Sequence, residues 1–298
     1  MRVGTSSLYS GIRQRIQQLA SELKDLNEKV ASGKKLNRPS DDPFAMVEAM
    51  KLKSTMVQFE QYGRNMKTAN SWTSLSESVF SQCLDLVGRA RELTVQMSSD
   101  TQNADTRLAA ASEAGHLLDQ AISLGNSQLA GRYIFSGYKT STVPFSKTTT
   151  AGVETAQYHG DIHDFQVQIG KDETISAGRN GQTALMNSTL FDTLGQLKKA
   201  LEDNDLAAIQ GQLGNLTTAE NYLNNQIADA GGRQNRLQVK QTVMDGLNGS
   251  LQERLSMAED ADLPGVIMEL KSREVAYQAA MAAAARIHDL TLLNYMSG

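Results

Sequence analysis

The sequence has few of the residues that stabilise small secreted or metal-dependent folds. Its 298 residues include a single cysteine, Cys83, so neither an intramolecular disulfide nor a zinc site built from cysteines can form. Only four prolines and 5% aromatic residues occur, while hydrophobic residues make up 40%. Small and straight-chain residues lose little rotamer freedom in a helix. The composition therefore favours a protein rich in long helices.

Long apolar runs and clusters of one charge are also missing. No run of about 18 apolar residues occurs, so we expect no membrane span. Residues 1–8 lack the apolar core of a cleaved secretory signal. The formal net charge is −4 and no basic cluster is present, which argues against a nucleic-acid partner. We expect either a cytoplasmic protein or one that is exported without a cleaved signal.

No motif for catalysis is present, whether a phosphate-binding glycine loop, a nucleophile elbow or a zincin signature. We therefore predict that the chain is not an enzyme and uses no cofactor or metal. The best metal candidates are His159 and His163 with Asp161 and Asp164. Their spacing of four suits a helix, whereas this segment has the pattern of strand and turn. Cys83 is expected to be a small core residue, because reactive thiols need an accessible, electropositive setting.

The strongest periodic signal is an apolar heptad pattern near the N-terminus. Steps of three and four residues alternate strictly over about three heptads, which predicts a helix with a narrow a/d seam. Such a seam suits one or two partner helices, and a lone helix of this length is marginal in water. The seam residues, which we predict to be assembly contacts, are Tyr9, Ile12, Ile16, Leu19, Leu23, Leu26 and Val30.

The C-terminal tail carries a second narrow seam, after a break in the pattern at residues 262–265. Pairing the two terminal seams only with each other would leave part of each apolar stripe exposed, and large exposed patches indicate association. We therefore predict that both seams contact other subunits. The predicted contacts in the tail are Leu270, Tyr277, Met281, Ile287 and Leu293.

The first helix is predicted to end near Gly33, and a short connector then starts the next helix. Asp42 can cap that helix, and Pro43 suits its first position, where a missing N–H has no effect on hydrogen bonding. The connector consists of Pro39, Ser40, Asp41, Asp42 and Pro43.

Helical patterns predict four more segments between the termini, over residues 44–98, 104–130, 191–201 and 205–257. The first and last of these are similar in length, so an antiparallel pair is expected. Four methionines are expected to pack in the core rather than on a binding surface. They are Met50, Met56, Met66 and Met97.

In the middle of the chain the helical pattern gives way to a strand-like pattern. Residues 131–137 indicate a short strand or hairpin, and Phe165, Val167 and Ile169 alternate with glutamines, as in a half-buried strand. We interpret residues 138–188 as a small β-rich insertion.

Together these patterns predict a mainly α fold: long antiparallel helical rods, paired N- and C-terminal coiled-coil helices and a small β-rich inserted domain. The predicted domains are a terminal coiled-coil (inner-tube) domain of residues 1–40 plus 262–298, a helical rod domain of residues 41–137 plus 189–261, and an outer inserted domain of residues 138–188.

Several motifs together resemble the bacterial flagellin superfamily. They are the heptad N-terminus, the connector Ser40-Asp41-Asp42-Pro43, the stretch Arg91-Glu92-Leu93-Thr94-Val95-Gln96 and the ending Leu292-Leu293-Asn294-Tyr295. The resemblance covers residues 1–137 and 190–298. Within the superfamily, four features are more similar to the hook–filament junction family, the hook-associated proteins of type 3, than to flagellins. They are the opening Met1-Arg2-Val3, the connector with Pro39, the segment Ile134-Phe135-Ser136-Gly137 leading to Pro144-Phe145, and the Asn-Tyr ending.

The resemblance implies a structural subunit that leaves the cell through the flagellar type III export route and resides in the extracellular flagellum. It implies that the terminal helices assemble with flagellin and with the hook-side junction protein, and that copies form a ring. It also implies a cytoplasmic export chaperone that binds the C-terminal helix.

Two alternatives stay open. The chain could be a short flagellin that forms the filament itself. From another class, it could be a ligand-binding β module on a coiled-coil stalk, which would need a pocket within residues 138–188. An innate immune receptor reads flagellins where Arg89, Leu93 and Glu113 fall, but Leu93 lies on the predicted core seam, which argues against that role here.

Overall fold

The computed structural model describes the backbone of residues 2–296 and the side chains of residues 10–286. The chain forms two compact units. Unit 1 consists of Met1–Val57 with Leu247–Gly298, and unit 2 consists of Gln58–Gly246. Two long helices, α2 (Pro43–Met97) and α6 (Leu206–Glu259), contribute residues to both units. The long helices confirm the mainly α fold predicted from the sequence.

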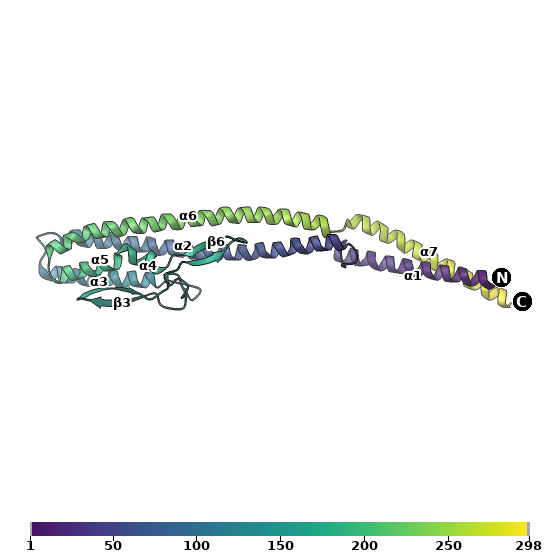
Figure 1. Cartoon of the computed structure of the whole chain (residues 1–298), viewed down its shortest axis with the longest axis horizontal. Coiled ribbons are helices and arrows are strands. Elements are labelled where there is room, and N and C mark those ends of the chain that lie inside the picture. Colours follow the sequence, from purple (N-terminus) through teal and green to yellow (C-terminus); the bar gives the residue numbers. More distant parts are fainter. Residues whose placement is uncertain (1, 297–298) are drawn as a thin grey trace. The chain divides into compact units, whose positions relative to one another are not determined.

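Unit 1 is built on a pair of terminal helices that lie side by side (Figure 1). These are α1 (Arg2–Ser32) and α7 (Leu263–Met296). Arg273 of α7 lies 3.2 Å from the carboxylate of Glu22 in α1, and Lys34 forms an antiparallel bridge with Asp260. Because the partner's number falls as the number in α1 rises, the two helices run antiparallel.

Local signals explain where α1 ends and α2 begins. Gly33 takes a φ of 71°, which a residue with a Cβ rarely adopts, and its N–H donates to the Lys29 carbonyl at 2.9 Å. Asp42 accepts hydrogen bonds from the N–H groups of Phe44 and Ala45, both at 3.0 Å. Asp42 is therefore the N-cap that its position before Pro43 predicts.

Unit 2 contains the antiparallel pair of α2 and α6 together with shorter helices. The Gln234 side chain of α6 donates to the Glu77 carboxylate of α2 at 2.7 Å, and Arg91 of α2 pairs with Glu220 of α6. Two further helices, α3 and α5, lie against each other in this unit. The shorter helices are α3 (Ala104–Gly125), α4 (Gly181–Ala184), the 3-10 helix η1 (Met186–Ser188) and α5 (Leu190–Glu202).

A buried arginine fixes the turn between α2 and α3. The Arg107 guanidinium donates to the carbonyls of Met97 at 3.1 Å and Ser99 at 3.0 Å, and to the Asn204 amide oxygen at 2.6 Å. Asn204 lies between α5 and α6, so the Arg107 side chain connects the α2–α3 turn to the α5–α6 turn. The bond to Met97 satisfies a carbonyl of the last turn of α2, and the bond to Ser99 holds the turn that follows.

Three separate antiparallel hairpins follow α3 in the chain. Two of them turn through Ala-Gly pairs with positive φ: Ala130-Gly131 at 50° and 77°, and Ala151-Gly152 at 52° and 78°. The first hairpin begins where a helix was expected, so the helix predicted over 104–130 is five residues shorter than expected. The strands are β1 (Gln128–Leu129), β2 (Arg132–Tyr133), β3 (Phe145–Thr150), β4 (Val153–Tyr158), β5 (Phe165–Gln168) and β6 (Thr174–Gly178).

The hairpins share one hydrophobic core with the helices of unit 2. The Phe145 ring of β3 lies 5.3 Å from that of Phe191 in α5, and Phe135, after β2, lies 5.7 Å from Phe80 in α2. Each of these rings is almost completely buried. The β-rich segment is therefore part of the packing of unit 2 and not a separately folded attachment.

In unit 2, α2 buries Trp72, Val79, Cys83, Leu93 and Met97, which confirms the core positions expected for Cys83, Leu93 and Met97. Met66 is buried as well, and Met56 is half-buried. The expectation for Met50 is wrong, since 63% of its surface is exposed. Met50 follows the buried Ala49 by one residue, or about 100° around the helix, and so points away from the core.

The contact between α5 and β4 yields a stability prediction. A Cβ on Gly195 would lie 1.7 Å from the Glu154 carbonyl oxygen, whereas a Cβ on Gly211 of α6 would meet open space. We expect Gly195→Ala to destabilise the protein by roughly 1–3 kcal/mol, because backbone would have to move. Gly211→Ala should stabilise it by roughly 0.5–1 kcal/mol. Thermal unfolding followed by circular dichroism should move the midpoint in opposite directions, and a stabilised Gly195→Ala variant would contradict this packing.

Candidate assembly interface

Unit 1 has a small hydrophobic core. Its two terminal helices meet along a narrow seam, and the ends of α2 and α6 add little buried apolar surface. Within the described side chains of this unit, the buried hydrophobic residues are Leu19, Leu26, Leu36, Ala49, Leu52 and Leu270.

The same unit exposes more large hydrophobic side chains than it buries. Phe44 at the start of α2 is 90% exposed, Met257 near the end of α6 is 75% exposed, and Met268 in α7 is 71% exposed. Apolar surface on this scale marks a site of association in soluble proteins. The described large hydrophobic residues that unit 1 exposes are Phe44, Val47, Met50, Val57, Leu247, Met257, Leu263, Ile267, Met268, Val275 and Met281.

The predicted seam of α1 lies where α1 meets α7. Leu19 and Leu26 are buried, and the other described members are half-buried. Their inner faces already have a partner in the same chain, so only the flanks are available to a neighbouring subunit. The half-buried members are Ile12, Ile16, Leu23 and Val30.

The predicted contacts in the tail divide between two surfaces. Leu270 is buried and Tyr277 is half-buried, whereas Met281 is 48% exposed. The side chains of Tyr9, Ile287 and Leu293 lie outside the described residues. The structure thus gives Leu270 and Tyr277 a partner within the chain and leaves Met281 available.

A second apolar stripe on α7 was missed in the sequence. Met268 and Val275 are seven residues apart and therefore share a face, and Val275 is 66% exposed. Met268 is two residues from Leu270, or about 200° around the helix, so this stripe faces away from α1. The alanine-rich sequence around it gives a weak contrast between the two faces, and the heptad through Leu270 and Tyr277 dominates the pattern.

The connector before α2 is held by two carboxylates. Asp41 accepts hydrogen bonds from the N–H groups of Arg38 at 2.9 Å and Asn37 at 3.0 Å, which together lower the pKa of Asp41. Asp42 caps α2 as described above, and the remaining connector residues Pro39, Ser40 and Pro43 are exposed. The two carboxylates fix the start of α2 and so the position from which Phe44 projects.

The linkers on either side of the terminal helices pair with each other. The Lys35 N–H donates to the Glu259 carbonyl at 2.7 Å, and the Ala261 N–H donates to the Gly33 carbonyl at 3.0 Å. The Glu259 carboxylate lies 2.7 Å from the Lys34 ammonium and 2.7 Å from the Lys53 ammonium. We call residues 33–35, residues 259–261 and Lys53 the linker clasp.

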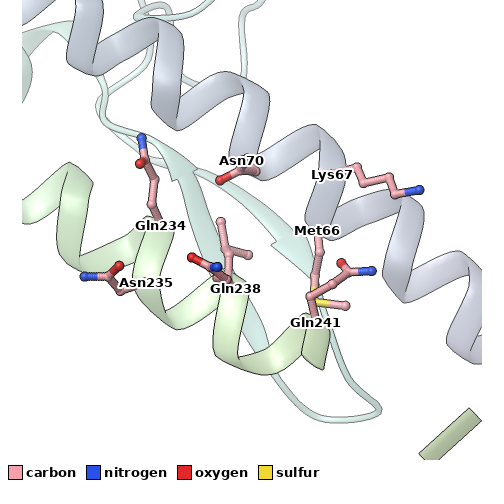
Figure 2. A pocket seen from close by; sticks show the side chains of 8 residues that line it. Met66, Lys67, Asn70, Gln234, Asn235, Gln238 and Gln241 are labelled. Atoms are coloured by element: carbon pink, nitrogen blue, oxygen red, sulfur yellow. The ribbon is translucent and has the colours of Figure 1, made fainter. Parts of the chain in front are cut away.

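Unit 2 has two open hollows beside α6. The first, of about 450 Å³, lies between α2 and α6 and is lined mainly by side-chain amides (Figure 2). The second, of about 470 Å³, lies between the β5–β6 hairpin and α6, where the charges of Glu173 and Lys240 are paired. Its other lining residues include Ile169, Ile175, Val239 and Val243. The hollow that touches the β-rich segment therefore offers mainly apolar contacts.

The residues considered for chemistry lie apart from these surfaces. His163 Nδ1 is 2.7 Å from Asp161 Oδ1, both in the loop between β4 and β5, and Ser146 Oγ of β3 is 2.6 Å from His159 Nε2 of the same loop. Burial raises the pKa of Cys83 to about 12, which keeps the thiol protonated. Among the side chains that the structure describes, no three histidine, cysteine, aspartate or glutamate residues are grouped as metal ligands. None of the helices, over the described residues, has an apolar stretch long enough to cross a bilayer.

The three residues at the position of the flagellin receptor contacts are buried or ion-paired within the subunit. Leu93 is only 3% exposed, and Arg89 lies 2.6 Å from Glu113 and 3.1 Å from Glu92. A receptor could reach the two charged residues but not the leucine side chain.

Known proteins share this fold and sequence. The N-terminal helical region of bacterial flagellin matches residues 3–140. Flagellar hook-associated protein 3 of Salmonella typhimurium (strain LT2) is 28% identical, over 94% of this chain and 95% of the relative. The protein of the same name from Escherichia coli (strain K12) is 31% identical, over 73% of this chain and 67% of the relative.

Solved structures agree on the fold. The crystal structure of hook-associated protein 3 from Legionella pneumophila matches with a TM-score of 0.62, over 70% of this chain and 98% of that chain. Its 14% identity limits this likeness to the fold. Fold and N-terminal region together define a protein of the bacterial flagellin superfamily. Within it, the chain belongs to the flagellar hook-associated protein 3 family.

The connector gives a prediction about α2. Asp42→Ala removes the side-chain acceptor for two N–H groups, and losing such a cap destabilises a helix end by about 1 kcal/mol. We expect the amides of residues 44–48 to exchange with deuterium about fivefold faster. Ser40→Ala is the matched control, because the Ser40 side chain makes no hydrogen bond within the described residues. Equal exchange in the two variants would show that Asp42 is not the cap.

Proposed function

We propose that this chain is a structural subunit of the bacterial flagellum that forms the junction between hook and filament. The observation that carries the proposal is the apolar surface of unit 1, which a single copy does not cover. Family membership supplies the setting, since the relatives are named for the flagellar hook.

The proposed partners are those of a junction. The terminal helices contact flagellin on one side and the hook-side junction protein on the other, and copies of the chain associate in a ring. A cytoplasmic export chaperone holds the C-terminal helix before export, which proceeds without a cleaved signal peptide. We further propose that residues 1–40 with 262–298 form the inner layer of the assembly, residues 41–137 with 189–261 the next layer, and residues 138–188 the outer face.

The role proposed is architectural, with no catalysis and no cofactor. A short flagellin is the nearest alternative, and flagellins do occur among the relatives, but at lower identity than the two hook-associated proteins. A ligand-binding β module is less well supported, because four of the eight residues that line the hollow at the β5–β6 hairpin are aliphatic, and two of its three charged residues, Glu173 and Lys240, pair with each other.

Energetics explain why assembly would complete the fold of unit 1. Covering one large apolar side chain contributes about 1.5–3 kcal/mol, whereas ordering the backbone opposes folding by about 1–2 kcal/mol per residue before hydrogen bonds are counted. Few residues in unit 1 are buried and many are exposed. Each contact that a neighbouring subunit makes with the exposed stripe therefore adds to a small internal core.

The second stripe of α7 provides a test. Val275→Thr keeps size and shape but adds a hydroxyl to an exposed position, so the free chain should unfold at an unchanged temperature. If Val275 is covered in the assembly, the hydroxyl loses its water and association weakens. Val143→Thr is the matched control, because Val143 is also exposed but lies on a loop of the β-rich segment.

The double variant with Val275→Thr and Met268→Gln and the Val143→Thr control would each be introduced into a strain that lacks the protein. We expect Val275→Thr, combined with Met268→Gln, to leave hooks without filaments and to release flagellin into the medium, as counted by electron microscopy and immunoblotting. Val143→Thr should restore filaments. Normal filaments in the Met268 and Val275 double variant would refute a role for this stripe in assembly.

A further inference from the structure

We propose that Glu259 is a positioning residue for assembly: its carboxylate joins the α1–α2 and α6–α7 linkers into one hinge, so that α1 and α7 are held as a pair. This inference rests on the proposed function, because a positioned pair matters only if the terminal helices assemble. It adds a specific device, the linker clasp, that the heptad pattern does not indicate.

The backbone of the clasp is a short antiparallel ladder. Lys35 and Glu259 share one hydrogen bond, Ala261 and Gly33 share a second, and Lys34 pairs with Asp260 between them. Two bonds of this kind between otherwise irregular segments are weak, since an isolated ladder of this length does not persist in water. Other contacts must therefore hold the linkers together.

The Glu259 side chain supplies those contacts. It is 8% exposed and accepts hydrogen bonds from the ammonium groups of Lys34 in the first linker and Lys53 in α2, both at 2.7 Å. Burial alone would raise the pKa of Glu259, but the hydrogen bonds from the two lysines outweigh burial and lower it. One carboxylate thus connects three segments: the α1–α2 linker, α2 and the end of α6.

A third cation of the clasp, Lys35, binds the end of α6. The Lys35 ammonium donates to the Met257 carbonyl at 2.6 Å, which satisfies an unpaired carbonyl of the last helical turn. Positive charge is also favourable at the negative end of the helix dipole. Asp260 is engaged by the Ser256 hydroxyl at 2.6 Å. The ammonium groups of Lys34 and Lys53 therefore face Glu259, while Lys35 and Asp260 are held at the same end of α6 by other partners.

A neighbouring ion pair in the same unit provides an internal contrast. Arg254 of α6 lies 3.3 Å from Glu48 of α2, and both side chains are about 60% exposed. Such an exposed pair contributes little to stability. Glu259 differs because its carboxylate is 8% exposed and pairs with two ammonium groups, while the side chains of Lys34 and Lys53 are 42% and 46% exposed. The two glutamates join the same two helices but differ in burial and in contact with a linker.

The clasp makes the order of α1 depend on that of α7. When Glu259 loses its charge, Lys34 loses its ion pair with Glu259. The ladder between Lys34 and Asp260 then loses its side-chain support. The α1–α7 seam still exists, but its direction from α2 and α6 is no longer fixed by the linkers. The α1–α7 pair would then adopt many orientations, and few of them would fit the contacts that the proposed assembly requires.

The test compares Glu259→Gln with Glu48→Gln in the full-length chain. Glutamine keeps the shape of each side chain and removes only its charge. Hydrogen–deuterium exchange at Lys35 and Ala261 reports the two ladder bonds directly. We expect exchange at least tenfold faster at both amides in Glu259→Gln, and unchanged exchange in Glu48→Gln and throughout residues 66–97 of both variants. Equal exchange at Lys35 and Ala261 in the two variants would overturn the proposal.

A second arm separates charge from shape. The variant with Lys34→Arg and Lys53→Arg keeps both positive charges, so it should preserve slow exchange and restore filaments in the strain lacking the protein. Lys34→Gln with Lys53→Gln should resemble Glu259→Gln in both assays. If the wild-type chain itself fails to restore filaments, the proposed function falls while the exchange result still decides whether the clasp exists. Loosened linkers with normal filaments would refute the positioning role alone.

Discussion

A pair of helices buries only the faces along which the two helices meet. In unit 1 those faces carry Leu19, Leu26 and Leu270, while Met268, Val275 and Met281 of α7 lie on other sides and remain exposed. Phe44 and Met257 add exposed apolar surface on α2 and α6. The chain could have replaced these side chains by polar ones without disturbing its own core. In the proposed junction, contacts with other subunits account for their presence, and the other features of unit 1 serve to present them.

Presentation depends on the linkers, because exposed side chains bind a neighbour productively only when their helices are directed. Gly33 ends α1 with a backbone conformation that favours glycine, Asp42 starts α2, and Glu259 joins the two linkers. In the proposed assembly, polar groups thus control the geometry and apolar groups supply the binding free energy. This division is economical, since ion pairs and caps are directional whereas burial of apolar surface is not.

The sequence was informative where one local rule decides the structure. The strict steps from Ile12 to Val30 predicted a helix with a narrow seam, and Asp42 before Pro43 predicted the cap. It was uninformative where two rules compete. Met50 and Met268 fit a helix equally well inside or outside, and only the three-dimensional partner decides which. The clasp was out of reach, because Lys34 and Glu259 are 225 residues apart and neither belongs to a motif.

The hairpins show a different limit. Ala130-Gly131 and Ala151-Gly152 form turns in which the alanine has a positive φ, although asparagine or aspartate is the usual residue before glycine there. The strain at each alanine is small and is offset by burial of Phe135 and Phe145 in the core that the hairpins share with α2 and α5. Tertiary packing thus selects turns that local preference disfavours. Unit 2 also exposes large side chains such as Ile162 and Val239, but its internal core is much larger than that of unit 1, so its fold depends less on neighbouring subunits.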